Sequence, residues 1–249
     1  MTFVDHLFVF ILFVILPIYS ALSQRRYLSQ IKTGQPADRN SLYRGTVITQ
    51  WIALAALMVF WFLLGRPFPD LGFVRPGGNG FYVGVVILIL VNGFFVYSWR
   101  RAKTMTAKEK LKEVQSLGDL IHFLPSTRQE LRSFLTVSLT AGIVEEIVYR
   151  GFVIWYLGLV MPLWAAVVFS SILFGLGHSY QGVSGAFKAG LVGLLFGAFY
   201  VLTGSIWLPI LGHVLWDALQ GLSIFEILSR KDSSNPPFEE VASEPGAIV

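Results

Sequence analysis

The chain of 249 residues is 54% hydrophobic, 15% aromatic and only 14% charged, and it contains no cysteine. Soluble domains carry about 25% charged residues, so this composition and the mean hydropathy of +0.64 argue against a soluble domain and predict an integral membrane protein. The lack of cysteine excludes disulfides, thiolate metal sites and cysteine nucleophiles. The net charge of +4 comes from basic residues in loops between apolar segments. That pattern is typical of membrane topology and lipid headgroups, so we expect no nucleic-acid partner.

The first apolar segment, residues 3–22, is predicted to be a transmembrane helix, since a bilayer core requires about 20 apolar residues. The alternative is a cleaved signal peptide, because "SALSQ" supplies small residues near a possible cleavage site. However, Asp5 and His6 lie at the start of the apolar run, and Arg25 and Arg26 follow it. This charge order is the reverse of that of a signal peptide. We therefore expect a retained helix with its N-terminus outside.

Two further spans, residues 46–64 and 81–99, contain no charged side chain. The loop before the first of them and the segment after the second are rich in Arg and Lys, whereas the connection "RPFPDLGFVRPGGNG" is nearly neutral. Basic loops stay in the cytoplasm, so the chain alternates consistently from an outside N-terminus. Residues 1–103 are thus predicted to form a unit of three transmembrane helices.

Residues 104–130 are predicted to form a cytoplasmic amphipathic helix at the membrane interface. In "KEKLKEVQSLGDLIHFL" the apolar positions recur at helical spacing, with charged residues on the opposite face.

Four more apolar segments, residues 134–157, 162–178, 186–203 and 206–228, complete an all-α bundle of about seven spans in the cell membrane. In the third of these, Gly190, Gly193 and Gly197 indicate close packing against a neighbouring helix. Residues 131–228 form the predicted C-terminal bundle. Residues 229–249 are polar and contain prolines, which predicts a disordered tail, and an odd number of spans places this tail in the cytoplasm.

Ionisable residues are rare in the spans before Arg100 but gather in the C-terminal bundle. Two of those in the bundle lie near segment ends, where long side chains reach the interface: Lys188 and Glu226. The other six lie deeper, where ionisable residues face the bundle interior and indicate function: Glu145, Glu146, Arg150, His178, His213 and Asp217.

Helical geometry separates the two adjacent glutamates. Glu146 and Arg150 are at positions i and i+4 with the acid nearer the N-terminus, the favourable order for an ion pair. Glu145 points about 100° away around the helix. We therefore expect Glu146 to be neutralised by Arg150 and to serve structure, whereas Glu145 is available as a general base.

Spacing also links the two histidines to neighbours one turn away. Phe174 precedes His178 by four residues, so its ring is expected to line the pocket next to the imidazole. His213 and Asp217 have the same spacing and share a helix face. Linear counting places His178 near the cytoplasmic end of its helix, so tilt or a longer fourth helix is required to bring it level with Glu145. A shared site implies a water-filled cavity that opens toward the cytoplasm.

These motifs resemble the CPBP family of intramembrane proteases, which includes CAAX prenyl endopeptidases and bacteriocin-processing, Abi-type proteins. The family pattern is E-E-x-x-x-R, then F-x-x-x-H, then H-x-x-x-N or a similar polar residue. The matching residues are Glu145, Glu146 and Arg150 in "EEIVYR", Phe174 and His178 in "FGLGH", and His213 and Asp217 in "HVLWD". The resemblance covers roughly residues 130–225.

The resemblance implies an endopeptidase that hydrolyses peptide bonds of membrane-associated or lipidated peptides or proteins. It implies that Glu145 activates water with help from His178, and that His213 and Asp217 stabilise the oxyanion. An ionised Asp, unlike Asn, cannot donate a hydrogen bond to that oxyanion. Asp217 is then either protonated or orients a charged His213, and the four-residue spacing favours the second interpretation.

The sequence leaves several alternatives open. No metal or other cofactor is expected, but a zinc protease would use His178, His213 and Glu145 as ligands. An ion-coupled transporter would also place ionisable residues in the membrane, although no inverted repeat is evident. A scaffold or immunity protein would use the same fold to bind a membrane partner. Haem ligation by the two histidines would leave both glutamates unexplained.

Overall fold

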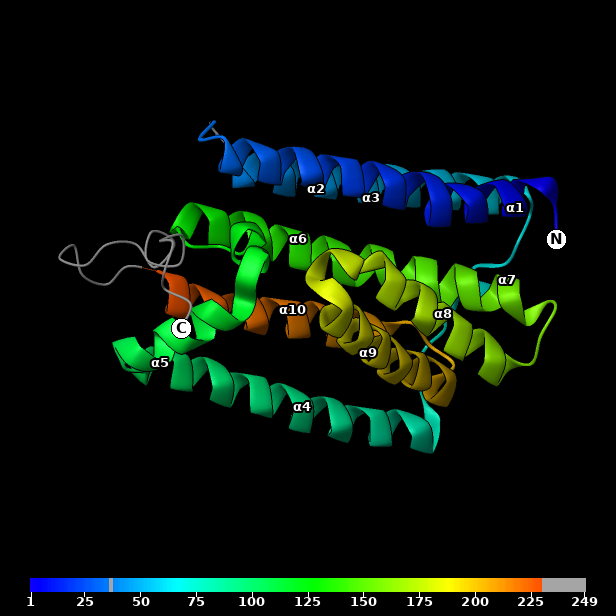
Figure 1. Ribbon diagram of the computed structural model, residues 1–249. Helices are drawn as coiled ribbons and strands as arrows, with labels where there is room; N and C mark the ends of the chain where they lie inside the picture. Colours follow the sequence, from blue (N-terminus) through cyan, green and yellow to red (C-terminus); the bar gives the residue numbers. More distant parts are fainter. Residues whose placement is uncertain (36–37, 230–249) are drawn as a thin grey trace.

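In the computed structural model, which describes residues 1–35 and 38–229, every element is a helix (Figure 1). The α-helices are α1 Phe3–Phe10, α2 Leu16–Lys32, α3 Arg39–Leu63, α4 Gly78–Thr104, α5 Ala107–Leu117, α6 Arg128–Glu146, α7 Ile154–Gly158, α8 Leu163–Gly177, α9 Gly182–Thr203 and α10 Trp207–Leu228. The π-helical segments η1 Ile11–Ile15 and η4 Ile147–Val153 join α1 to α2 and α6 to α7, and 3₁₀ turns lie at η2 Phe68–Leu71, η3 Gly118–Phe123 and η5 Ser179–Gln181.

Within these residues, five helices are long and apolar enough to cross a membrane. They are Phe3–Lys32, Arg39–Leu63, Gly78–Thr104, Ser179–Thr203 and Trp207–Leu228. The remaining predicted spans correspond to the run from α6 through η4 to α7 and to the shorter helix α8. The chain is therefore a multi-pass membrane protein, and the total of seven spans stays a prediction.

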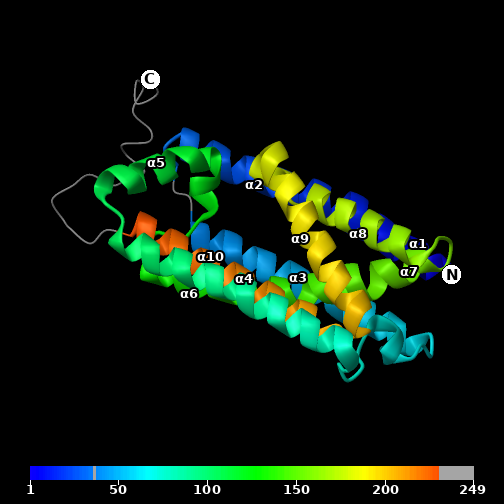
Figure 2. The ribbon, with the colours of Figure 1, turned by 90° about the horizontal axis from the view of Figure 1, so that it is seen from below.

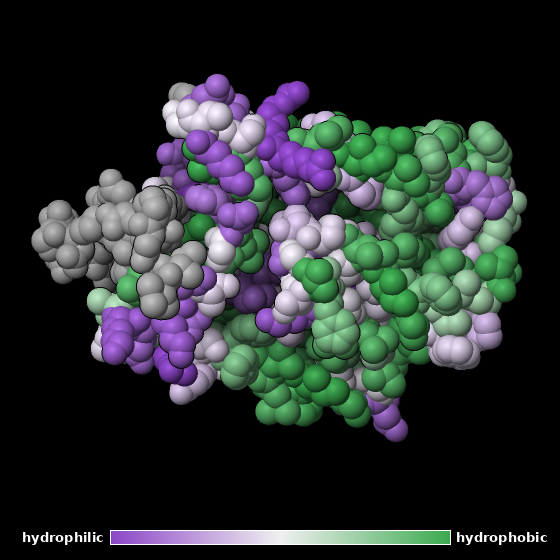
Figure 3. Space-filling model, in the orientation of Figure 1, coloured by the Kyte–Doolittle hydropathy of each residue, from purple (hydrophilic) through white to green (hydrophobic). Residues whose placement is uncertain are grey.

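The long helices lie side by side and alternate in direction (Figures 1 and 2). Helix α10 packs against both α4 and α6, and α3 packs on α6. One end of the bundle, which we call the α5 end, carries the C-terminal ends of α2, α4 and α10, and the N-terminus lies at the opposite end. Figure 3 shows hydrophilic residues concentrated at the α5 end and an apolar surface over much of the rest. That division fits a bundle whose α5 end leaves the bilayer.

Helix α8 does not run the full length of the bundle. Its 15 residues extend about 22 Å at 1.5 Å per residue, less than the roughly 30 Å of a bilayer core. After the turn at η5, α9 returns obliquely toward the end where α8 began (Figure 2). The α8–α9 turn therefore lies within the depth of the bundle.

Small residues allow α9 to approach α8 closely, as the glycine spacing predicts. A Cβ at Gly197 would lie 2.7 Å from Val167 Cγ1, and one at Gly193 would lie 3.3 Å from the Ser171 Cα. On α8, a Cβ at Gly175 would lie 2.6 Å from the Ala186 carbonyl oxygen. These contacts leave no room for a larger side chain.

The segment of residues 104–130 is not one continuous helix. Helix α5 begins at a capping box, in which Thr106 Oγ1 accepts from the Glu109 N–H and the Glu109 carboxylate accepts from the Thr106 N–H. It ends at Leu117 because Gly118 adopts a positive φ of 51°. The 3₁₀ turn η3 and an extended stretch then lead to α6. The predicted helix is thus confined to 11 residues, and whether it lies at the membrane interface stays a prediction.

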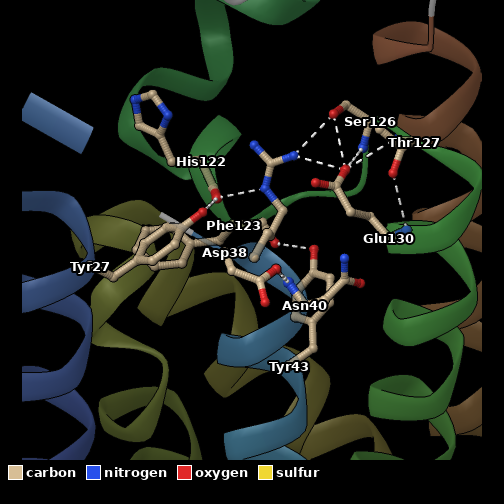
Figure 4. A network of polar contacts seen from close by, with 10 residues as sticks. Tyr27, Asp38, Asn40, Tyr43, His122, Phe123, Ser126, Thr127 and Glu130 are labelled. Carbon is tan, nitrogen blue, oxygen red and sulfur yellow. Dashed lines mark hydrogen bonds and ion pairs between the residues drawn. The ribbon is translucent and has the colours of Figure 1, made fainter. Parts of the chain in front are cut away.

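The linker between α5 and α6 is fastened to α2 and α3 through its backbone carbonyls (Figure 4). Tyr27 Oη and Arg39 Nε donate to the His122 carbonyl at 3.0 and 2.9 Å. Tyr43 Oη donates to the Phe123 carbonyl at 2.7 Å. These bonds satisfy carbonyls that no regular helix would pair.

Glu130 fixes the start of α6 in the same network (Figure 4). Its Oε2 atom accepts from Arg39 Nη1, from the Ser126 N–H and Oγ, and from the Thr127 N–H, at 2.9–3.0 Å. Burial acts to raise the pKa of Glu130, but the Ser126 N–H bond, the Arg39 charge and the Thr127 N–H bond together hold it below its ordinary value of 4.5. Glu130 is therefore an ionised structural group whose Oε2 atom accepts several hydrogen bonds.

Residues 36–37 and 230–249, the latter including all but the first residue of the predicted disordered tail, lie outside the described part of the chain.

Candidate active site

The three polar motifs converge inside the bundle from α6, α8 and α10. Glu145 and Glu146 form the last turn of α6, and the π-helical segment η4 follows directly and carries Arg150. His178 caps the C-terminal end of α8, and His213 lies two turns into α10. Single π-helical turns inside α-helices occur frequently at functional sites. All six predicted deep ionisable residues thus belong to one region.

Glu146 and Arg150 form the predicted ion pair. Arg150 Nη1 donates to Glu146 Oε1 at 2.8 Å, and Arg150 Nη2 donates to the Gly193 carbonyl on α9 at 2.9 Å. Both side chains are almost completely buried, with 0% and 2% exposure. The guanidinium also lies 4.6 Å from the centre of the Phe174 ring, within the range of a cation–π interaction. This pair therefore joins α6, α8 and α9.

His213 lies between two carboxylates. Its Nδ1 is 2.7 Å from Glu146 Oε1, and its Nε2 is 3.6 Å from Asp217 Oδ2. The contact with Asp217 matches the predicted i, i+4 pair, although 3.6 Å is too long for a direct hydrogen bond. The contact with Glu146 was not expected from the sequence, because 67 residues separate the two. Glu146 thus serves both Arg150 and His213.

Glu145 is in a different environment from its neighbour. Its Oε1 accepts a hydrogen bond of 2.8 Å from Gln50 Nε2 on α3. Its Oε2 lies 4.0 Å from His178 Nε2 and, although buried, has no hydrogen-bond partner among the described residues. The side chains of Glu145 and His178 remain 17% and 20% exposed. One carboxylate oxygen is therefore held, and the other faces an imidazole.

His178 is oriented by its own helix. Its Nδ1 lies 2.8 Å from the Phe174 carbonyl oxygen, and because a carbonyl only accepts, Nδ1 must carry the proton. In the neutral ring the lone pair is then on Nε2, the atom that faces Glu145. The Phe174 ring lies 4.6 Å from the imidazole, centre to centre, as the spacing predicts. The histidine thus presents an acceptor to the carboxylate.

The depth of His178 follows from the shortness of α8. His178 is at the end of its helix, as linear counting predicts, but that end lies inside the bundle instead of at its surface. Neither exceptional tilt nor a longer fourth helix is required to bring His178 to Glu145. Hydrophilic residues are visible in a recess near the middle of the face shown in Figure 3.

Gln50 is the site residue that the sequence analysis missed. It lies in "VITQWIALAA", within a predicted span that has no charged side chain. A neutral amide gives no charge signal, and 95 residues separate it from Glu145. A polar amide among apolar neighbours was nevertheless the one available clue, since such groups seek partners in lipid.

The zinc ligand set expected from the alternative does not converge. No group of three His, Asp or Glu side chains within residues 1–35 and 38–229 is arranged to hold a metal ion. His178 Nδ1 is committed to a carbonyl, and both nitrogens of His213 face carboxylates that are not members of that set. The side chains as placed therefore do not fit zinc, and we derive no step through a metal.

Comparisons with known proteins agree with the motifs. Residues 127–219 match the family model described as "Type II CAAX prenyl endopeptidase Rce1-like", a segment that contains all six deep ionisable residues. The chain is also 24% identical over 189 residues to "Putative membrane peptidase YdiL" of Bacillus subtilis (strain 168), which covers 73% of each chain. No solved structure matches at the same level of significance.

Proposed function

We propose that this chain, which is similar to the Rce1-like CAAX prenyl endopeptidases and to a putative membrane peptidase, hydrolyses peptide bonds inside the membrane with a water activated by Glu145. The observation that carries the proposal is the pairing of Glu145 Oε2 with His178 Nε2 at 4.0 Å. A separation above 3.5 Å between two polar atoms suits a bridging water. Such a water would donate one hydrogen to the carboxylate and the other to the imidazole.

The reaction follows from these positions. Glu145 takes a proton from the water as the oxygen attacks the scissile carbonyl, which gives a tetrahedral intermediate with a negatively charged oxygen. When the C–N bond breaks, the proton passes from Glu145 to the leaving amine. The products are a carboxylic acid and an amine, and the glutamate returns to its starting form. No further reactant is required.

His213 is the donor for the oxyanion in this proposal. Both ring nitrogens face carboxylate oxygens, an arrangement that a doubly protonated ring satisfies best because both nitrogens then donate. The 3.6 Å separation from Asp217 leaves the Nε2–H without a direct hydrogen bond, so it is available to a developing oxyanion. This supports the interpretation in which Asp217 orients a charged His213. It requires no protonated Asp217.

The family match and the apolar surface of the bundle support a substrate class. The matched family model describes CAAX prenyl endopeptidases, so membrane-associated or lipidated peptides are the proposed substrates. Such peptides lie in or at the bilayer, as the apolar surface of the bundle does.

Cleavage of a quenched fluorescent peptide library by detergent-purified protein tests the proposal. The wild-type protein is expected to cleave members of the library, and Glu145→Gln is expected to lose at least about 100-fold of this activity, since general base catalysis contributes about 10²–10⁴-fold. A Glu145→Gln protein that cleaves at the wild-type rate would overturn the proposal.

A further inference from the structure

We propose that Gln50 is a positioning residue of this protease, which holds the Glu145 carboxylate so that Oε2 faces His178. The inference rests on the proposed function of Glu145. It concerns helix α3, which lies outside the segment that the family model matches.

The first support is that the two carboxylate oxygens of Glu145 have different contacts. A glutamate side chain has three rotatable torsions, so burial alone does not fix where its carboxylate points. Gln50 Nε2 donates to Oε1 at 2.8 Å, and no other described residue donates to this carboxylate. Without that bond, either oxygen is free to turn away from His178. The Gln50 amide therefore determines which oxygen meets the water.

The second support is the chemistry of an amide at this position. A lysine or arginine here would neutralise Glu145, as Arg150 does for Glu146, and would weaken it as a base. A glutamine donates a hydrogen bond and leaves the net charge of the carboxylate in place. The two adjacent glutamates thus receive different partners, an amide for the one that reacts and a guanidinium for the one that does not.

The third support is that Gln50 is not required merely to attach α3 to α6. The next residue, Trp51, donates from Nε1 to Thr140 Oγ1 at 3.2 Å, which is a second hydrogen bond between the same two helices. Thr140 is buried. Among the described residues, its side chain hydrogen-bonds to Trp51 and to none of the motif residues. The Trp51–Thr140 bond is therefore a matched internal control for the Gln50–Glu145 bond.

The experiment compares Gln50→Met with Trp51→Phe in the purified full chain. Each variant removes one donor between α3 and α6. Met is similar in size to Gln, and the smaller Phe ring replaces Trp51 at a position that is 43% exposed, so both variants should show only a small fall in melting temperature. Gln50→Met is expected to lower kcat/KM by about 10- to 100-fold, since a misplacement of about 1 Å costs about 10²-fold. Trp51→Phe is expected to remain within about twofold of the wild type.

Separate measurement of kcat and KM on the folded protein distinguishes positioning from a simple loss of folded enzyme. Both variants are purified by size-exclusion chromatography in detergent, and rates are expressed per folded, monodisperse protein. A misplaced carboxylate should lower kcat while KM stays close to that of the wild type, because an interaction made only in the transition state is lost. Equal losses of kcat in both variants, or a loss that appears only in KM, would overturn the inference.

The outcome remains separable from that of the proposed function. If Glu145→Gln is inactive while Gln50→Met has wild-type activity, the role of Gln50 is refuted and the glutamate mechanism stands. If Glu145→Gln is itself active, the proposed function fails first.

Discussion

Two glutamates on α6, Glu130 at its start and Glu145 near its end, show how the same side chain serves structure in one place and chemistry in another. Glu130 Oε2 receives four hydrogen bonds, including one from Arg39. Glu145 receives one bond, from a neutral amide, and its buried Oε2 atom receives none from the described residues. A carboxylate with several donors, one of them a cation, stabilises the fold, whereas one with a single neutral donor and a buried oxygen without a partner retains an acceptor for a reactant.

Glu146 lies between these extremes. Its Oε1 atom accepts from Arg150 and contacts His213 Nδ1, but its buried Oε2 atom has no partner among the described residues. We interpret Glu146 as a structural group that also orients His213. Substitutions of these carboxylates and of their partners test whether each carboxylate serves structure or catalysis.

The largest effect is expected for Arg150→Met. It leaves Glu146 buried without its cation, and breaking a buried ion pair in this way costs about 3–5 kcal/mol. Thermal unfolding in detergent measures the loss. Arg44→Met is the control, because the Arg44–Asp38 pair is exposed, with 65% and 56% exposure of the two side chains, and such pairs contribute about 0–1 kcal/mol. Equal losses would show that burial does not set the value of these pairs.

A smaller loss of stability is expected for Glu130→Gln. Hydrogen bonds to a charged group contribute about 1.5–3 kcal/mol, and the carboxamide replaces only part of the network. Because the pKa of Glu130 is lowered in the folded state, its contribution is fully present above the ordinary value of 4.5 and is lost as the pH falls from there through the folded value. The melting temperature of the wild type should therefore fall more steeply below pH 4.5 than that of the variant. Parallel curves would contradict an ionised, structural Glu130.

Asp217→Asn is expected to have a modest effect on activity, within about tenfold of the wild type, or about 1.4 kcal/mol. The Asn oxygen can keep the same contact with His213, and the Asn amide can donate to the oxyanion. Asp217→Leu, which keeps neither property, should lose more. A folded but inactive Asn variant would refute the orienting role of Asp217.

The smallest effect, none at all, is expected from a metal chelator. Since the candidate zinc ligands do not converge among the described residues, incubation with a chelator should leave kcat/KM unchanged. Activity that is lost on chelation and restored by added zinc would contradict a metal-free site and would require His178 and His213 to reorient.

The sequence alone predicted the contacts that are local on one helix. The pairs Glu146–Arg150, Phe174–His178 and His213–Asp217 are each four residues apart, and helical periodicity brings such residues together. The helices that carry them were also predictable, because apolar runs of this length become helical in lipid.

Contacts between distant segments were not predictable in the same way. The bond of Glu146 to His213 and that of Glu145 to Gln50 depend on how helices pack, which hydropathy does not encode. The depth of His178 required knowing that α8 turns back inside the bundle. The single helix predicted for residues 104–130 was interrupted because Gly118 adopts a positive φ, which periodicity does not reveal.

A side-by-side comparison of Glu145→Gln and Glu146→Gln tests the central claim most directly, by measuring peptide cleavage and melting temperature for both. The substitutions are chemically identical and adjacent in the chain. We predict that Glu145→Gln loses cleavage but keeps a melting temperature close to that of the wild type, whereas Glu146→Gln is markedly less stable. A Glu145→Gln protein that still cleaves, or a Glu146→Gln protein as stable as the wild type, would contradict the assignment of catalysis to one glutamate and structure to the other.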